Sequence, residues 1–141
     1  MNILISAIVC SHNRSAFLNK AIQSLTSQSL QKNKYEIVII DNASTDNTKK
    51  SVIQSQNDFP DHNIRYVYEE NLGLSIARNR GICESKANYL AYLDDDAIAD
   101  KFWLENILNV FETTTEKTGI VGGKVIPHWE SPRPIWLHDL L

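Results

Sequence analysis

Three consecutive aspartates, Asp94, Asp95 and Asp96, are the side chains of this sequence whose type and spacing most directly suggest chemistry. They follow the apolar stretch 89–93, which predicts a buried strand that ends in a charged cluster. Adjacent carboxylates repel one another and raise one another's pKa unless a counter-charge is present. A solvated turn would disperse that repulsion into water, whereas a divalent cation would neutralise it at the strand end. We favour the cation, and the turn remains the alternative.

Two further predicted strands also end in polar side chains. Residues 3–10 are almost continuously apolar, as in a central strand covered on both faces, and Ser11, His12 and Asn13 follow them. Residues 35–40 form a second apolar run, which ends at Asp41 and Asn42. Parallel strands bring their carboxyl ends to one edge of a sheet, where ligands of open α/β sheets bind. The sequence therefore predicts one site built from three strand ends.

The elements that must position this site alternate between strands and helices. Apolar positions at helical spacing predict a helix through residues 16–25, another through Val52 and Ile53, a short one through 74–82 and a fourth through 104–111. Strands are expected at 3–10, 35–40, 64–68, 89–93 and 119–126, with a bulge at Gly122 and Gly123 in the last. This order predicts an α/β fold with a mostly parallel sheet, right-handed crossovers and helices on both faces.

Composition narrows the functional classes. With 141 residues, 43% hydrophobic and 22% charged, the chain suits one globular domain. A net charge of −3 and the lack of a basic stretch argue against a nucleic-acid partner, and no apolar run predicts a membrane span. The N-terminal stretch lacks the features of a signal peptide. Cys10 and Cys83 show no metal-ligand spacing, so we expect reduced, mostly buried thiols in a cytoplasmic protein.

The predicted edge suits a negatively charged ligand only if a cation bridges the carboxylates. Mg²⁺ or Mn²⁺ held by one or two carboxylates and completed by a diphosphate meets this requirement. Asp41 or Asn42 could form a hydrogen bond with the edge of a nucleobase, and His12 could stack on that nucleobase. The alternative is that the strand-end Asp is only a cap and that the loop His is solvated. The predicted helix start at 73–74, with Arg78, suits an anion. The alternative is that Arg78 forms a surface ion pair and that Asn79 has only a structural capping role.

Four segments in the same order and at similar spacing resemble the family 2 glycosyltransferases. They are residues 6–14, 40–46, 71–79 and 93–96, and the resemblance extends from residue 6 to about residue 126. It implies the GT-A fold, a Rossmann-like nucleotide-binding unit, in agreement with the predicted elements. It also implies a nucleotide-diphosphate-sugar donor, Mg²⁺ or Mn²⁺ as the cofactor, and a role in polysaccharide or glycan biosynthesis.

The resemblance assigns roles to individual residues. It implies that the nucleobase lies against Cys10, Ser11, His12, Asn13, Asp41 and Asn42. Asp94 and Asp95 match the positions near the ribose and the diphosphate, and Arg78 and Asn79 complete the donor site. Asp96 matches the metal-binding end of the family's DxD motif, with Asp94 as the other carboxylate.

The resemblance fails at the catalytic base. Family members that invert the sugar use an Asp or Glu from the second half of the domain, which we expect beyond Leu141, because neither Glu130 nor Asp139 has a matching context. We therefore expect residues 1–141 to be the nucleotide-sugar-binding part of a single, incomplete GT-A domain. The alternative is a non-catalytic nucleotide-binding, metal-binding or assembly module. The apolar stretch 135–141 predicts self-association, and we expect a cytoplasmic location, at most peripheral to the inner face of a membrane.

Overall fold

The computed structural model describes residues 3–114, 118–129 and 131–132. Strands and helices alternate along this part of the chain, as the sequence predicts. The elements are β1 (Ile5–Ser11), α1 (Ser15–Thr26), β2 (Tyr35–Asn42), α2 (Thr48–Asp58), β3 (Ile64–Glu69), α3 (Leu74–Glu84), β4 (Tyr89–Tyr92) and α4 (Trp103–Thr113).

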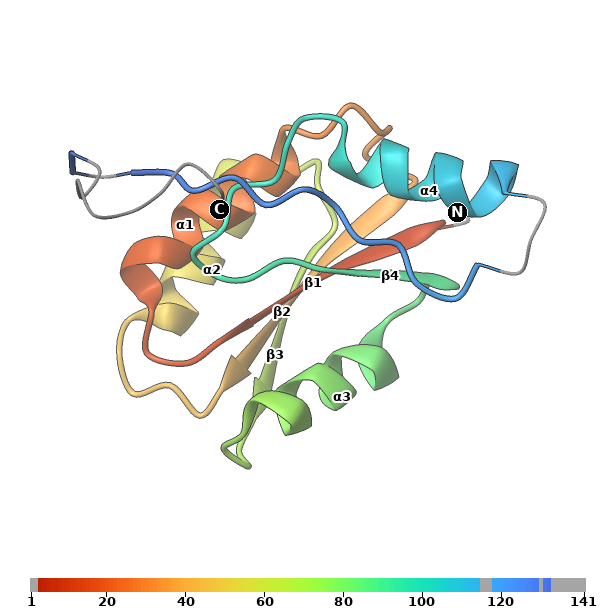
Figure 1. Ribbon diagram of the computed structural model, residues 1–141. Helices are drawn as coiled ribbons and strands as arrows, with labels where there is room; N and C mark the ends of the chain where they lie inside the picture. Colours follow the sequence, from red (N-terminus) through yellow and green to blue (C-terminus); the bar gives the residue numbers. More distant parts are fainter. Residues whose placement is uncertain (1–2, 115–117, 130, 133–141) are drawn as a thin grey trace.

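The four strands form one fully parallel sheet in the order β3-β2-β1-β4 (Figure 1). β1 lies between β2 and β4, and its register pairs Ile5 with Tyr35 at one end and Ser11 with Asp41 at the other. The prediction that residues 3–10 contain a central strand is confirmed. Because β1 and β2 are in register, their carboxyl ends stop at the same edge.

Helices cover both faces of the sheet, with α1, α2 and α4 on one face and α3 on the other (Figure 1). Alternation along β1 explains this arrangement, because successive side chains point to opposite faces. Ile5, Ala7 and Val9 belong to the larger core beneath α1 and α4, whereas Ile8 belongs to a smaller core with Ala77 of α3. The α/β fold predicted from the sequence is confirmed.

α3 packs closer to the sheet than its sequence suggests. Its buried positions are Ala77 and Gly81, whereas Ile82, which we expected on the core side, is half exposed. A Cβ added to Gly81 would lie 2.7 Å from Cγ2 of Ile8, so the helix approaches β1 through a position without a side chain. The close contact sets the distance between α3 and the carboxyl end of β1.

Two predicted strands differ from the observed ones. β4 is an edge strand of four residues in which only Ala91 is buried, because it pairs with β1 alone. The strand expected at 119–126 is wrong: these residues form neither strand nor helix, and Ile120 and Val125 are each 91% exposed. No described strand pairs with this stretch, and an extended chain without a neighbour leaves its backbone groups to water. The predicted bulge at Gly122 and Gly123 is absent with it.

Two expectations drawn from composition can also be compared with the structure. Within the described ranges, no helix combines the length and apolarity needed to cross a membrane. Cys10 and Cys83 are free thiols, as expected. Cys10 is half-buried but Cys83 is exposed, which corrects the expectation that both are mostly buried, since α3 turns Cys83 away from the sheet.

Candidate functional site

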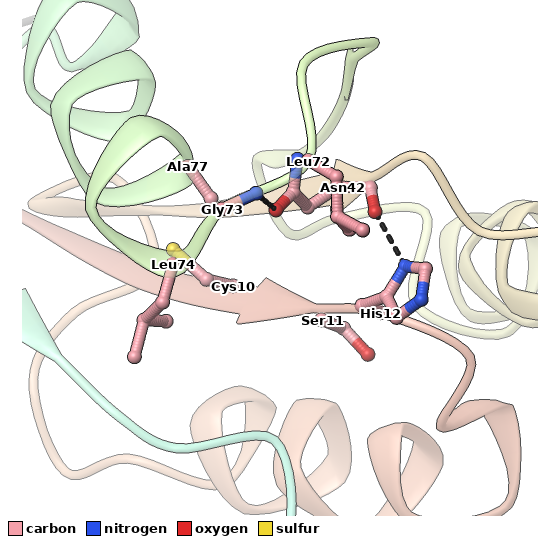
Figure 2. Close-up of a pocket in the computed structure, with 8 residues that line it drawn as sticks. All are labelled: Cys10, Ser11, His12, Asn42, Leu72, Gly73, Leu74 and Ala77. Carbon is pink, nitrogen blue, oxygen red and sulfur yellow. Dashed lines mark hydrogen bonds between the residues drawn. The ribbon is translucent and has the colours of Figure 1, made fainter.

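The carboxyl ends of β1 and β2 and the start of α3 enclose a cavity of about 270 Å³ (Figure 2). Its lining residues come from these three elements, from the loop after β1 and from the turn before α3: Cys10, Ser11, His12, Asn42, Leu72, Gly73, Leu74 and Ala77. Two of the three strand ends that the sequence predicts to converge, those of β1 and β2, therefore line one cavity. Leu72, Leu74 and Ala77 give the cavity an apolar wall, which suits the flat face of a ring better than it suits an anion.

Asn42 joins the end of β2 to the turn that precedes α3. Its Oδ1 accepts a hydrogen bond from the backbone N–H of Gly73 at 2.8 Å, and its Nδ2 donates to the carbonyl of Asn71 at 2.6 Å (Figure 2 draws the first). The side chain is buried, and both of its polar atoms are used within the protein. The Gly73 amide, which we expected to be free for an anion at the helix start, is occupied by this contact.

Gly73 itself has a backbone that disfavours other residues. Its φ is +154°, and a Cβ there would lie 3.3 Å from Cδ1 of Ile76. Glycine therefore lets the turn enter α3 at the angle that places Leu72 and Leu74 around the cavity.

His12 has a defined hydrogen-bonding state. Its Nδ1 lies 2.6 Å from the carbonyl oxygen of Asn42, and because a carbonyl only accepts, Nδ1 carries the proton (Figure 2). Nε2 is then the acceptor of a hydrogen bond from Nδ2 of Asn13 at 3.1 Å. The ring is exposed, and both of its nitrogen atoms have hydrogen-bond partners within the protein.

Asn13 makes hydrogen bonds that connect the loops after β1 and β2. Its Oδ1 accepts hydrogen bonds from the backbone amides of Thr45 and Asp46, at 2.8 and 3.2 Å. Asn13 has a φ of 53°, a left-handed backbone uncommon outside glycine but tolerated by asparagine. These contacts tie the loop after β1 to the loop after β2, so Asn13 shapes the site without lining the cavity.

Asp41 is buried and has both carboxylate oxygens partnered. Oδ1 accepts from the backbone amide of Ser44 at 3.0 Å, and Oδ2 accepts from the Tyr66 hydroxyl at 2.6 Å. Burial, followed by the bond to Asp41, raises the pKa of Tyr66, so this phenol stays protonated and keeps donating. Asp41 is not among the cavity-lining residues, and its Tyr66 partner could not be inferred from sequence spacing.

The three aspartates occupy different environments. Asp95 is buried and accepts a hydrogen bond from the Ser11 hydroxyl at 2.7 Å, whereas the side chains of Asp94 and Asp96 are 80% and 46% exposed. Burial raises the pKa of Asp95, against the effect of Ser11 and a nearby arginine. The cluster thus combines one carboxyl fixed to the end of β1 with two that face solvent.

Arginines supply the counter-charge that the cluster requires. Nη2 of Arg14 lies 2.7 Å from Oδ2 of Asp96, and its Nε lies 3.5 Å from Oδ1 of Asp95. Arg78 approaches Asp94 at 3.9 Å, which matches the ion-pair alternative for Arg78. Arg14 was missed as a site residue, because 82 positions separate it from Asp96.

A smaller cavity of about 20 Å³ lies beside the first and shares Cys10 and Leu74 with it. Arg78 and Asp94 also line it, so the carboxylate cluster reaches the edge of the apolar cavity. Burial raises the pKa of the Cys10 thiol to about 11, which keeps it neutral there. Asn79 is exposed on α3 and lines neither cavity, so the structure does not bring it to the other predicted residues.

The donor set fits one kind of metal site. Within residues 3–114, 118–129 and 131–132, no three His, Cys, Asp or Glu side chains converge on a point that could hold a metal. The exposed carboxylates of Asp94 and Asp96 instead suit Mg²⁺ or Mn²⁺, which can take one or two carboxylates and complete their coordination with phosphate and water. The base candidates Glu130 and Asp139 and the apolar stretch 135–141 lie outside the described residues.

Comparison with known proteins supports the fold and the family. The sequence model of glycosyl transferase family 2 matches residues 6–140. The glycosyltransferase AglE of Haloferax volcanii is 33% identical over 121 residues, covering 86% of this chain and 39% of the relative. A glucosyl-dolichyl phosphate glucuronosyltransferase of the same organism is 26% identical, covering 92% and 41%. The chain thus spans about two fifths of the length of these relatives.

Two solved structures share the fold. The mannosyltransferase PcManGT of Pyrobaculum calidifontis, determined with GDP-Man and Mn²⁺, superposes with a TM-score of 0.75 at 23% identity, over 82% of this chain and 34% of that one. TarS of S. aureus, determined with UDP-GlcNAc, superposes with a TM-score of 0.72 at 21% identity, over 89% and 37%. The predicted GT-A fold is confirmed by these similarities, and the match covers only a part of each neighbour.

Proposed function

Because this chain belongs to the family 2 glycosyltransferases, we propose that residues 1–141 form the nucleotide-sugar-binding part of a GT-A glycosyltransferase domain. The domain would transfer a sugar from a nucleotide-diphosphate donor to an acceptor hydroxyl in glycan or polysaccharide biosynthesis. The neighbours determined with GDP-Man and with UDP-GlcNAc support a donor of this class.

One observation carries the proposal: an apolar cavity at the carboxyl edge of a parallel sheet adjoins a cluster of carboxylates. The cavity would take the nucleobase, with the His12 ring and Cys10 among its lining residues. Asp41 and Asn42 would act mainly by holding the walls, because their side-chain polar atoms are already bonded within the protein. Ser11, which lines the cavity, donates a hydrogen bond to Asp95 and so links the cavity to the aspartate cluster.

Asp96 and Asp94 would hold the divalent cation at this edge. When bound, Mg²⁺ or Mn²⁺ neutralises the charge that develops on a departing diphosphate. Arg78, with a side chain 48% exposed beside Asp94, supplies a guanidinium at the same edge that can bond phosphate oxygens. The chain's own residues would therefore contribute a pocket for the nucleobase, two exposed carboxylates for the metal, and the guanidinium of Arg78 for the phosphates.

Isothermal titration of the chain with UDP, GDP and ADP, with and without Mn²⁺, tests the proposal. We expect one of these nucleotides to bind in preference to the others and to bind more tightly with Mn²⁺. Asp96→Asn should abolish the gain from Mn²⁺ while leaving the fold intact, since this side chain is half exposed. Asp61→Asn is the matched control, because Asp61 is 81% exposed and pairs with Lys32 in a remote loop. Equal behaviour of the two variants would refute the role of Asp96.

A further inference from the structure

The aspartate cluster already contains a positive charge that neither the sequence nor the family resemblance assigned to it. Arg14 contacts two of the three carboxylates, at 2.7 Å to Asp96 and 3.5 Å to Asp95. Its guanidinium thus lies against Asp96, the carboxylate that the proposed function gives to the metal. A guanidinium and a divalent cation on the same carboxylate repel each other and compete for its oxygen atoms.

Arg14 is held at this place by contacts independent of Asp96. It is the residue that precedes α1, and its guanidinium carbon lies 5.0 Å from the centre of the Phe17 ring, in cation–π geometry. Its backbone carbonyl accepts hydrogen bonds from the amides of Phe17 and Leu18, at 3.0 and 3.2 Å. Asn13, immediately before it, is tied to the loop after β2. The guanidinium can therefore release Asp96 and still be retained by Phe17 and Asp95.

We propose that Arg14 is an internal cation of the aspartate cluster that competes with a divalent cation for Asp96. In the absence of metal it holds the half-exposed Asp96 carboxylate in place. Binding of the metal requires the ion pair between Arg14 and Asp96 to open. Arg14 is thus a positioning residue that lowers the affinity of the cluster for bare metal, and this inference rests on the proposed metal role of Asp96.

The effect of Arg14 on the affinity for Mn²⁺ should be small and should depend on salt. The side chains of Arg14 and Asp96 are 44% and 46% exposed, and ion pairs of such exposure are weak. We expect Arg14→Gln to bind Mn²⁺ more tightly than the unchanged chain, on the order of two- to fivefold at low ionic strength. Salt at about 0.5 M should shrink the difference, because it screens exposed charges.

The test measures Mn²⁺ binding by electron paramagnetic resonance of the free ion, on the full chain and without nucleotide. Arg14→Gln should gain affinity, and Arg14→Lys, which keeps the charge, should stay near the unchanged chain. Arg80→Gln is the matched control, because it removes the same charge from α3, where Arg80 pairs with Glu84 at 2.9 Å. Thermal unfolding without nucleotide, with and without Mn²⁺, gives a second readout: Mn²⁺ should raise the Tm of Arg14→Gln more than that of Arg80→Gln.

Equal or weaker binding of Mn²⁺ by Arg14→Gln, or an equal gain in Arg80→Gln, would overturn the proposal. The proposed function would survive that result if the unchanged chain binds Mn²⁺ and Asp96→Asn does not. If no variant binds Mn²⁺ with or without a nucleoside diphosphate, both the competition and the metal role of Asp96 are wrong. The two failures are therefore distinguishable.

Discussion

Replacing Asn42 by alanine would remove the brace between the end of β2 and the start of α3. The side chain makes two short hydrogen bonds, to the amide of Gly73 at 2.8 Å and to the carbonyl of Asn71 at 2.6 Å, and a longer one to the carbonyl of Glu69 at 3.4 Å. Asn42→Ala leaves those backbone groups without their partner. The turn that carries the apolar cavity wall, with Leu72 and Leu74, is then held by fewer contacts.

The magnitude follows from the exposure of the groups left behind. An unpaired buried backbone group costs roughly 1–3 kcal/mol, and water can replace part of the bonding where the group is accessible. Asn42 is buried, but Asn71 is exposed and Gly73 is half-buried, so each short bond should count at the low end of the range. We expect Asn42→Ala to lower the free energy of unfolding by about 2 kcal/mol. For a chain of this size the Tm should fall by roughly 6–8 °C.

Chemical denaturation and isothermal titration with nucleoside diphosphates check this expectation together. Nucleotide affinity should fall with stability, because the same turn forms the cavity wall. Asn42→Asp keeps the acceptor for Gly73 but places a carboxylate against the Asn71 carbonyl, so it should lose at least as much stability at neutral pH. Asn79→Ala, an exposed change on α3, is the control. An unfolding free energy of Asn42→Ala within about 0.5 kcal/mol of the unchanged chain would refute the reasoning.

Two other perturbations address the fold around the site. Gly81→Ala should lower the free energy of unfolding by about 1–3 kcal/mol, because the added Cβ would lie 2.7 Å from Cγ2 of buried Ile8. Chemical denaturation measures this change, and a gain in stability from helix propensity would contradict the expectation. His62 should make stability depend on pH, because burial lowers its pKa below the usual 6.5 and its buried Nδ1 has no hydrogen-bond partner among the described residues. The unfolded chain then takes up the proton first, so stability should be lost as pH falls from about 6.5 through the folded pKa, and His62→Gln should flatten this slope in thermal scans from pH 7.5 to 5.

Much of the fold and part of the site could be predicted from sequence because they depend on local periodicity. The almost continuous apolar run at residues 3–10 marked a central strand, and the spacing of Leu18, Ala21, Ile22 and Leu25 marked the buried stripe of α1. Strand ends could be read from the change from apolar to polar residues. Parallel pairing then implied that these ends meet, because parallel strands have their carboxyl ends at the same edge of the sheet.

Tertiary structure decided which side chains satisfy one another. Arg14 reaches Asp96 across 82 positions and Tyr66 reaches Asp41 across 25, and neither pair has a spacing that periodicity could reveal. Strand order made β4 an edge strand, and no described strand pairs with residues 119–126, although their composition resembles that of a strand. The three aspartates by themselves showed that a counter-charge is needed. Only the tertiary fold places Arg14, which precedes α1, beside the aspartates that follow β4, and so supplies that charge. An ion pair depends on distance in space and not on order along the chain.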